Sequence, residues 1–543
     1  MKVSNQLYKV FLEELQFEME FREQYADQYP SVPLEHDDPD IKRMIEALAL
    51  FSARTRQAGE NSIKSLHYRM FQSYFPYLIS PLPAMGMVKL IPENLVEPLV
   101  VEKNTNIIIT GQRGESAIFR SLFDMSVLPL KISSIDYSGS FGDSSKIVIQ
   151  FESPIEVSTR LGVLSLYVNY LNSFPESLVL LEFFKSSLSS AEIIFDGRPK
   201  HGCGVSYGKV SECHEDINPV EKERRFFHLP HQSLYLNLQI SETPRNWRKF
   251  AVVLNLDGKL PRDMRLHKDV FQLFVIPIEN LRQEEAEPIV CDGTKTDYPI
   301  RPAKLGEGQE LHSVVGVFKD DTDKSAALYS DIVSSGQDSF VVKQQLTENN
   351  NRQNYVSLNI PAAFDSPVNI TVSALWHKPS FGLQNWDKMT VQPYHSNIPG
   401  FKWELNDRIT RSVDIDYQKN SDEYLRLSAL KNKTEMNFDE VLFILDMLTG
   451  VWTGEFAIIR DLLVGLSVEK RNIINANLSG SLSYLYLFSV KKHEAHVKPL
   501  LMIFAEHLER ILSAWVPGST IKVKMKENTK IITSNRRENT DVS

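Results

Sequence analysis

The chain has 543 residues, too many for one ordinary hydrophobic core, so we expect two to four domains. Its 69 acidic and 60 basic residues are mixed along the chain and give a formal net charge of -9, which argues against nucleic acid as a partner, since that requires a concentrated basic face. Three cysteines do not suggest a disulfide framework, and no apolar run reaches the length of about 18 residues that a membrane span needs, so we expect a soluble protein of a reducing cytoplasm.

The opening residues predict a helix with two apolar faces. One neighbour cannot cover both faces, so we expect this helix to be buried in a bundle, either its own or one shared with other subunits. The two faces follow helical spacing and consist of Tyr8, Phe11, Leu12, Leu15 and Met19 on one side and Phe17, Phe21 and Tyr25 on the other.

Two further amphipathic helices are predicted between residues 38 and 76. Asp38 is a natural N-cap, and Pro39 suits the first helical position because its missing N–H costs nothing there. Pro76 is expected to end the second helix. Their apolar stripes are Ile41, Met44, Ile45, Leu48 and Phe51, followed by Ile63, Leu66, Met70, Phe71 and Tyr74.

From Met85 to about residue 395, short β-branched and aromatic runs between turn residues predict sandwich-like sheets. One helix, at 177–186, is expected to interrupt them. The predicted strands are 87–91, 106–110, 117–122, 146–151, 164–170, 192–195, 234–240, 251–256, 270–276, 314–318, 339–343, 355–360 and 369–376.

The carboxyl-terminal part is expected to mix helices and strands. A helix from Phe438 should end at Gly450, and a second should run from Pro499 to Pro517. In the closing strand, apolar residues from Ile521 to Met525 alternate with lysines, as in an edge strand protected by charge. The residues after Asn528 are polar, and we expect them to be disordered.

The predicted fold class is therefore α+β, with an N-terminal helical segment, β-rich middle domains and a mixed α/β C-terminal domain. The expected segments are a helical bundle at 1–84, a β-rich domain with a helix at 85–260, a second β-rich domain at 261–400, the mixed domain at 401–527 and the tail at 528–543.

No pattern assembles a catalytic or metal-binding constellation. Ser206 lies in a G-x-S-x-G sequence, but a buried helix after the serine is missing, so a Gly-rich turn is the better interpretation. The spacing of His201, Cys203, Cys213 and His214 is poor for zinc. His493-Glu494-Ala495-His496 lacks the i, i+4 spacing of a zincin, and Asp320-Asp321-Thr322-Asp323 lacks the glycine and distal glutamate of a calcium loop. We expect no enzyme activity and no cofactor or metal.

Several blocks resemble, in order, the TssF family of baseplate wedge subunits from bacterial type VI secretion systems. Residues 38–90 and 117–130 carry the most specific similarity, and the similarity is thin from 320 to 470. The blocks are Asp38-Pro39, Met44-Ile45-Glu46-Ala47, Phe51-Ser52-Ala53-Arg54, the Pro-rich stop after Phe75, Phe119-Arg120-Ser121, Glu287-Pro288-Ile289, Asp297-Tyr298-Pro299 and Asn477-Leu478-Ser479-Gly480-Ser481-Leu482.

The resemblance implies a structural scaffold in the bacterial cytoplasm, at the cytoplasmic side of the inner membrane when assembled. It implies that two copies pair with one TssG-like subunit through a shared helical bundle. Further implied partners are TssE-like and TssK-like baseplate proteins and a VgrG-like spike hub, with no nucleic acid and no membrane insertion. The partner interface is then expected at Tyr8, Phe11, Leu12, Leu15, Met19, Phe21, Ile41, Met44, Ile45, Leu48 and Phe51.

Two alternatives stay open from the residues alone. The first stripe fits an intramolecular core as well as it fits a subunit interface. The whole chain could instead be a β-sandwich protein that binds glycans or another ligand, with a helical oligomerisation arm. In that case Trp376, Trp386 or Trp403 would be exposed for stacking on sugars, although core packing explains them more simply.

Overall fold

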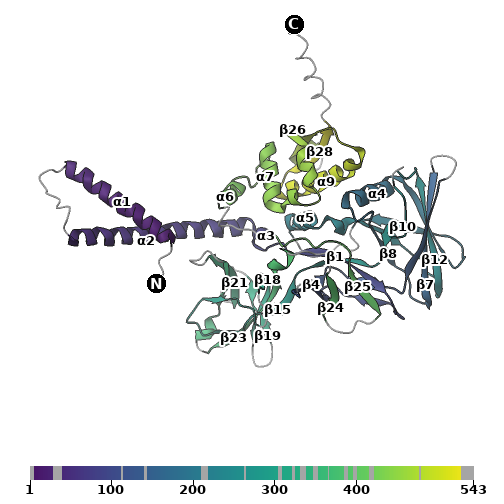
Figure 1. The fold of residues 1–543 in the computed structure, drawn as a ribbon, viewed down its shortest axis with the longest axis horizontal. Coiled ribbons are helices and arrows are strands. Elements are labelled where there is room, and N and C mark those ends of the chain that lie inside the picture. The colour runs from purple at the N-terminus through teal and green to yellow at the C-terminus, as the bar shows by residue number, and fades with distance from the viewer. Residues whose placement is uncertain are drawn as a thin grey trace, which may run out of the picture. The chain divides into compact units, whose positions relative to one another are not determined.

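The computed structural model describes residues 5–28, 39–111, 114–139, 144–208, 218–261, 264–303, 308–320, 325–330, 338–346, 352–364, 366–383, 389–394, 400–414, 421–475 and 478–527. The chain forms two units, drawn in Figure 1. The first comprises Met1–Pro76, Gln344–Gln353 and Tyr417–Ser428, and the second comprises Tyr77–Lys343, Asn354–Asp416 and Ala429–Ser543. Helices and strands are both abundant, which confirms the predicted α+β class.

The first unit is built on two long helices, α1 (Asn5–Gln28) and α2 (Pro39–Tyr74). The prediction of two helices after Pro39 is wrong, because α2 is one continuous helix of 36 residues. Only one strong helix breaker, Gly59, lies between the two apolar stripes, and a single glycine costs about 1 kcal/mol in a helix interior. The helix ends just before Pro76, as predicted. In the same unit, Tyr424 of α6 (Ser421–Ala429) packs on Phe71 with ring centroids 4.7 Å apart.

In the second unit, a six-stranded antiparallel sheet draws its strands from distant parts of the chain. Its order is β24-β3-β4-β14-β1-β25. Strands from three of the predicted segments, 85–260, 261–400 and 401–527, share this sheet, and the division into four consecutive domains stays a prediction. The bounds are β1 Met85–Pro92, β3 Asn106–Thr110, β4 Ser116–Ser121, β14 Val275–Glu279, β24 Thr390–Pro393 and β25 Phe401–Leu405.

An eight-stranded sheet, in the order β13-β8-β11-β10-β9-β12-β7-β6, packs against α4 (Phe174–Ser187), which is the helix expected at 177–186. The single strand predicted at 270–276 is two strands in two sheets, because Phe274 has a left-handed backbone with φ 54°. The bounds are β6 Lys131–Gly139, β7 Ser144–Val157, β8 Val163–Val168, β9 Leu188–Phe195, β10 His201–Tyr207, β11 Tyr235–Gln239, β12 Trp247–Asp257 and β13 Phe271–Gln272.

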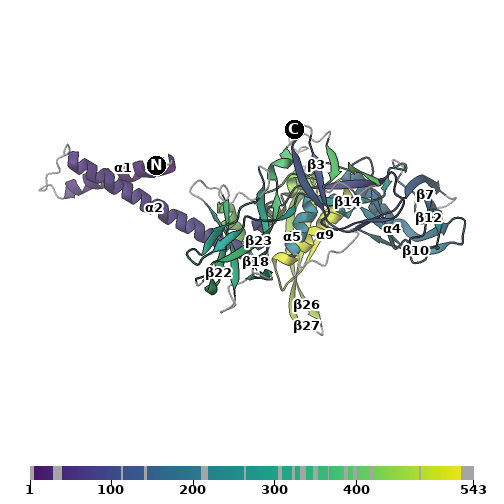
Figure 2. The same ribbon diagram turned by 90° about the horizontal axis from the view of Figure 1, so that it is seen from below.

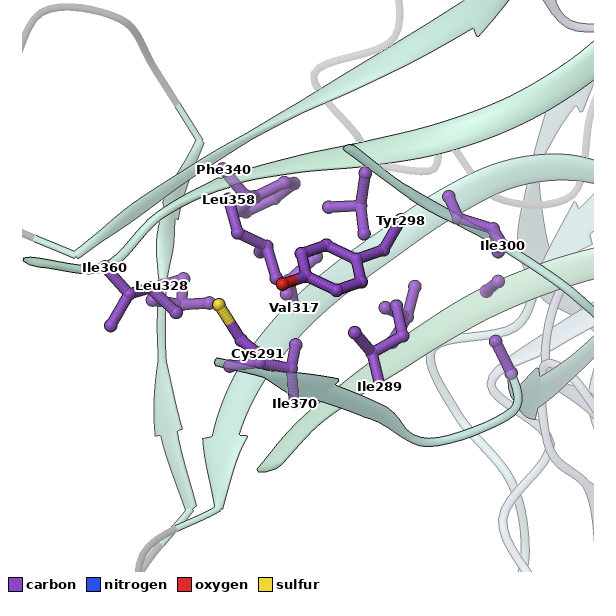
Figure 3. Close-up of a cluster of buried hydrophobic side chains, with 14 of the residues drawn as sticks. Ile289, Cys291, Tyr298, Ile300, Val317, Leu328, Phe340, Leu358, Ile360 and Ile370 are labelled. Atoms are coloured by element: carbon purple, nitrogen blue, oxygen red, sulfur yellow. The ribbon is translucent and has the colours of Figure 1, made fainter. Parts of the chain in front are cut away.

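Two smaller sheets enclose one apolar core, which confirms the sandwich expected in the middle of the chain. Figure 3 shows this core, in which Val317, Leu358 and Ile370 from different strands meet around Tyr298. The sheet orders are β15-β23-β18-β19, with β16 on β23, and β17-β22-β21-β20. The bounds are β15 Arg282–Glu285, β16 Ile289–Cys291, β17 Asp297–Pro299, β18 Glu310–Asp320, β19 Ser325–Ala327, β20 Tyr329–Ser330, β21 Ser339–Leu346, β22 Arg352–Asn359 and β23 Val368–His377.

The carboxyl-terminal part contains the helices expected there. A capping box between Asn437 and Glu440 starts α7 (Phe438–Thr449), and Gly450 ends it in the left-handed conformation. The second predicted helix is α9 (Lys498–Trp515). The closing strand β28 (Thr520–Glu527) is an edge strand with Ile521 and Val523 buried, as predicted.

Two strands and a helix are among the elements of this unit that the sequence analysis did not predict. The antiparallel strands β26 (Leu463–Asn475) and β27 (Leu478–Val490) extend past β28 as a two-stranded ribbon, visible in Figure 2. The helix α5 (Pro219–His228) lies where only strands were expected. The remaining elements are α3 Pro76–Ile79, α8 Ala457–Leu462, β2 Leu99–Val101 paired with β5 Met125–Val127, and 3₁₀ turns at Pro230–Ser233, Pro361–Phe364, Pro379–Leu383, Val451–Thr453 and Ala495–Val497. The predicted tail at 528–543 lies outside the described residues.

Charged side chains of α5 are buried among the surrounding elements. The Arg225 guanidinium donates to Glu279 Oε2 at 3.0 Å, while Arg120 binds Glu279 Oε1 with two N–H groups at 2.7 and 2.9 Å. The Glu279 charge raises the pKa of Arg225. On the opposite side of the same helix, Glu223 hydrogen-bonds His507 of α9. The helix is therefore held by ion pairs as well as by apolar packing.

We expect Glu279→Gln to lower the free energy of unfolding by about 3–5 kcal/mol, because it removes the buried carboxylate that Arg120 and Arg225 share and leaves Arg225 only its more exposed partner, Glu221. The matched control is Glu221→Gln, which removes the more exposed partner of the same Arg225 and should cost less than about 1 kcal/mol. Chemical denaturation of the three proteins measures both values. Equal losses of unfolding free energy in the two variants would contradict the role of Glu279 as the main buried partner of Arg225.

We also expect the second unit to lose stability in mild acid. Burial lowers the pKa of His228 and of His377 from 6.5 to about 4, so the folded chain keeps both rings neutral. In the unfolded chain both rings titrate near their ordinary value, so it binds extra protons as the pH falls from about 6.5 towards 4. Between pH 7 and 5 the free energy of unfolding should fall by about 2 kcal/mol per histidine.

Urea denaturation at each pH measures this slope. A His377→Gln variant should show about half of the loss attributed to the two histidines. A free energy of unfolding that is the same at pH 7 and pH 5 would contradict the prediction.

Candidate partner interface

The two long helices of the first unit form an antiparallel hairpin held by small and polar contacts. Glu14 of α1 accepts hydrogen bonds from the Ser52 hydroxyl at 2.7 Å and from Arg56 at 3.0 Å, both on α2. These two donors, Ser52 first, lower the pKa of Glu14. Ala49 and Ala53, one turn apart on α2, are fully buried. The helices therefore approach closely at these small side chains, while most of their large apolar side chains stay exposed.

Most residues of the predicted interface are exposed on this hairpin. Phe51 is 73% exposed and Met44 is 66% exposed, which is unusual for side chains of this size in a folded protein. Phe11, Leu15 and Ile45 are partly buried, and the side chain of Ile41 lies outside the described ones. The other exposed members are Tyr8, Leu12, Met19, Phe21 and Leu48.

The exposed apolar surface extends beyond the predicted residues. On α1 it includes Phe17 and Tyr25, the second face recognised in the sequence, with the Tyr25 ring 6.4 Å from that of Phe21. On α2 it includes Leu50, which helical spacing did not single out. The stripe near the end of α2 is divided, because Phe71 is buried whereas Ile63, Leu66, Met70 and Tyr74 are exposed.

The zinc candidates are not brought together in the described residues. Cys203 is buried in β10, where burial raises its pKa to about 11, so it is a poor thiolate ligand. His201 contacts Glu242 at 2.9 Å. Cys213 and His214 lie outside the described residues. Within the described part of the chain, no three His, Cys, Asp or Glu side chains are grouped as metal ligands.

The other chemical motifs are elements of the fold. The predicted Gly-rich turn at Ser206 is wrong, because this serine lies in β10, paired with Asn237 of β11. Residues 201–207 do not alternate regularly between apolar and polar side chains, so the sequence did not indicate a strand there. Asp320 closes β18, and 321–324 lie outside the described residues. His496 is exposed in the turn before α9 and pairs with Glu494 at 3.2 Å.

The two tryptophans that the structure describes among the three candidates for sugar stacking are buried. Trp376 and Trp403 are 2% and 5% exposed, and the Trp376 indole donates to the Glu284 carbonyl at 3.2 Å. Trp386 lies outside the described residues. Among the described helices, none combines the length and the apolar character that crossing a membrane requires.

A family model described as "Type VI secretion system, TssF" matches residues 3–169 and 222–358, which together are more than half of the chain. The chain belongs to the TssF family. This confirms the resemblance, and both of its most specific stretches, 38–90 and 117–130, fall within the matched residues.

Known proteins agree with this membership. The type VI secretion system component TssF1 of Pseudomonas aeruginosa is 22% identical over 149 residues, so the match spans 25% of this chain and only 24% of that protein. A chain of the cryo-electron microscopy structure of the type VI TssK-TssF-TssG baseplate subcomplex superimposes with a TM-score of 0.70 at 14% identity, over 90% of this chain and 96% of that chain. A chain of the type VI secretion baseplate complex superimposes with a TM-score of 0.55 at 13% identity, over 96% of this chain and 96% of that chain. At these identities the structures establish a shared fold.

For this TssF-family chain, the small contact between α1 and α2 can be tested directly. We expect Ala49→Leu to force the helices apart and destabilise the hairpin by about 1–3 kcal/mol, because a fully buried alanine leaves no room for a larger side chain. Hydrogen–deuterium exchange of the α1 amides should then accelerate. Ala47→Leu, at an exposed position of the same helix, is the control and should leave exchange unchanged. Slow exchange in both variants would show that α1 does not pack there.

Proposed function

We propose that this chain is a structural scaffold subunit of a type VI secretion baseplate wedge. The observation that carries the proposal is the set of large apolar side chains left exposed on the α1–α2 hairpin. Exposed apolar patches mark partner surfaces in soluble proteins. Membership of the TssF family and the likeness to a chain of a TssK-TssF-TssG subcomplex indicate which partners to test first.

In this proposal two copies of the chain pair with one TssG-like subunit, and helices of all three chains form a shared bundle. Each copy then presents the same sequence to two different environments, which suits broad surfaces with residues such as Met19 and Met44 that adapt to their neighbours. The wedge includes TssE-like and TssK-like proteins and assembles around a VgrG-like spike hub, at the cytoplasmic side of the bacterial inner membrane. The role is steric and conformational, without covalent chemistry.

Stoichiometry tests the proposal. Light scattering during size-exclusion chromatography gives the mass of the chain alone and after co-expression with the TssG-like protein of the same genome. A complex of two copies with one partner supports the wedge. A monomer that does not bind the partner overturns it.

We expect Leu12→Asp and Phe51→Asp each to weaken the complex at least a hundredfold, because an unpaired carboxylate buried at an interface costs several kcal/mol. Both side chains are exposed in the hairpin, so these changes disturb the isolated fold less than changes at the partly buried Phe11 or Leu15. Gln24→Asp adds the same charge at an exposed polar position of α1 and is the control. Titration of the partner against each variant measures the dissociation constants. Unaltered binding by both apolar variants would remove the hairpin from the interface.

A further inference from the structure

Many exposed apolar side chains of the α1–α2 hairpin share one side of it. On α1, Phe17 and Phe21 follow Glu14 by three and seven positions, so they share its helix face. On α2, Leu48 lies four positions before Ser52, which donates to Glu14 at 2.7 Å. Both stripes therefore flank the same hydrogen bond. We call this surface the wide side, and it consists of Phe17, Phe21, Tyr25, Met44, Leu48 and Phe51, all of them exposed.

The wide side runs continuously along both helices. The two hydrogen bonds of Glu14 fix the alignment of the antiparallel helices, which Figures 1 and 2 show side by side. About one turn further along α1, Phe17 is level with Phe51, and the next turn brings Phe21 level with Leu48. The rings of α1 and the apolar side chains of α2 therefore form one strip.

A narrower stripe occupies the other side of α1. Tyr8, Leu12 and Met19 share a face at four- and seven-residue spacing, and all three are exposed. Leu12 is two positions from Glu14, which places it across the helix from the wide side. A neighbour that covers the wide side therefore leaves this stripe for a different chain.

The two helices of the hairpin have opposite net charge. Six acidic and two basic residues lie on α1, whereas α2 has six basic and three acidic ones. At the rim of the wide side, Glu20 follows Phe17 by three positions on α1, and Arg54 follows Phe51 by three on α2. Both charged side chains are exposed, and neither forms an ion pair within the described part of the chain. Each edge of the wide side thus has a charge of its own sign.

A second copy of the chain complements this pattern. With α1 of one copy on α2 of the other, an acidic helix meets a basic one at both contacts, and Glu20 of each copy faces the side of Arg54. A two-fold axis parallel to the helices produces this reciprocal contact. The other face-to-face arrangement with two-fold symmetry stacks α1 on α1 and α2 on α2, which brings like charges together. A foreign helix of either charge sign would attract one helix of the hairpin and repel the other.

We propose that the wide side binds the wide side of a second copy of this chain, with α1 of each copy on α2 of the other. The inference rests on the proposed scaffold function and specifies how its two copies meet. Rings such as Phe21 then pack on side chains such as Met44 of the other copy, whose flexible thioether adapts to its neighbours. The narrower stripe stays open to the TssG-like subunit.

Charge reversal in two copies of different mass tests the reciprocal contact. Glu20→Arg makes α1 repel α2 of an identical copy, and Arg54→Glu makes α2 repel α1 of an identical copy. A pair with one copy of each variant regains attraction at both contacts. When both variants are co-expressed with the TssG-like protein, we expect mixed pairs to outnumber each kind of like pair about tenfold. Native mass spectrometry of the purified complexes counts the three species.

A matched control separates the wide side from the overall charge of α1. Glu23→Arg reverses an exposed charge on the other side of α1, and its co-expression with Arg54→Glu should give no excess of mixed pairs. All three changed side chains are exposed, so each variant alone should keep the natural melting temperature. An equal excess of mixed pairs with Glu23→Arg would contradict the assignment to the wide side.

The remaining outcomes distinguish this inference from the scaffold function. Statistical mixing of Glu20→Arg with Arg54→Glu, in complexes that contain two copies, means that another chain covers the wide side. That result overturns the reciprocal contact and leaves the scaffold function standing, as does the absence of any pair from these two variants when the natural chain pairs. A natural chain that forms no complex with two copies overturns the proposed scaffold stoichiometry, and this inference with it.

Discussion

The buried charges of α5 are the constraint on which the second unit depends. Arg224 donates from Nε to the Leu448 carbonyl at the end of α7, at 2.8 Å, and also reaches the carbonyl of Tyr77. The next residue, Arg225, binds Glu279 of β14. One helix of ten residues is thus tied to the carboxyl-terminal helices and to the six-stranded sheet. Because each unpaired charge costs several kcal/mol, arrangements that break any of these contacts are strongly disfavoured.

The sequence predicts the helices and strands whose buried residues follow a simple period. It does not predict elements that are held in place by buried polar contacts. α7 and α9 have one apolar face each and clear stop signals, so their limits follow from Gly450 and Pro517. α5 was missed because its buried face includes Glu223 and Arg224, which hydrophobic periodicity counts as exposed. Their partners lie far away in the chain, and only the folded structure brings them together. Likewise, Phe274 separates two strands through its backbone conformation, for which its residue type gives no signal.

The candidate interface was predictable in its residues but not in its geometry. Apolar spacing alone could not decide whether Leu12 or Phe51 faces a core or a partner. The structure leaves both exposed because the helices meet on other faces, where Ala49 is buried and Ser52 donates to Glu14. Alanine and serine contribute little to a hydrophobic pattern, so the pattern does not locate this contact.

The two units differ in which side chains they bury. In the second unit, ionised groups such as Glu279 are enclosed and paired within the chain, which favours one arrangement before any partner binds. In the first unit, rings such as Phe51 are exposed, while small and polar side chains such as Ala49 and Ser52 lie between α1 and α2. A helical hairpin with so little internal burial gains most of its stability from whatever covers its apolar face. The order of the first unit is therefore expected to depend on assembly, whereas that of the second is not, and this asymmetry suits a scaffold that is rigid in its body and adaptable at its contacts.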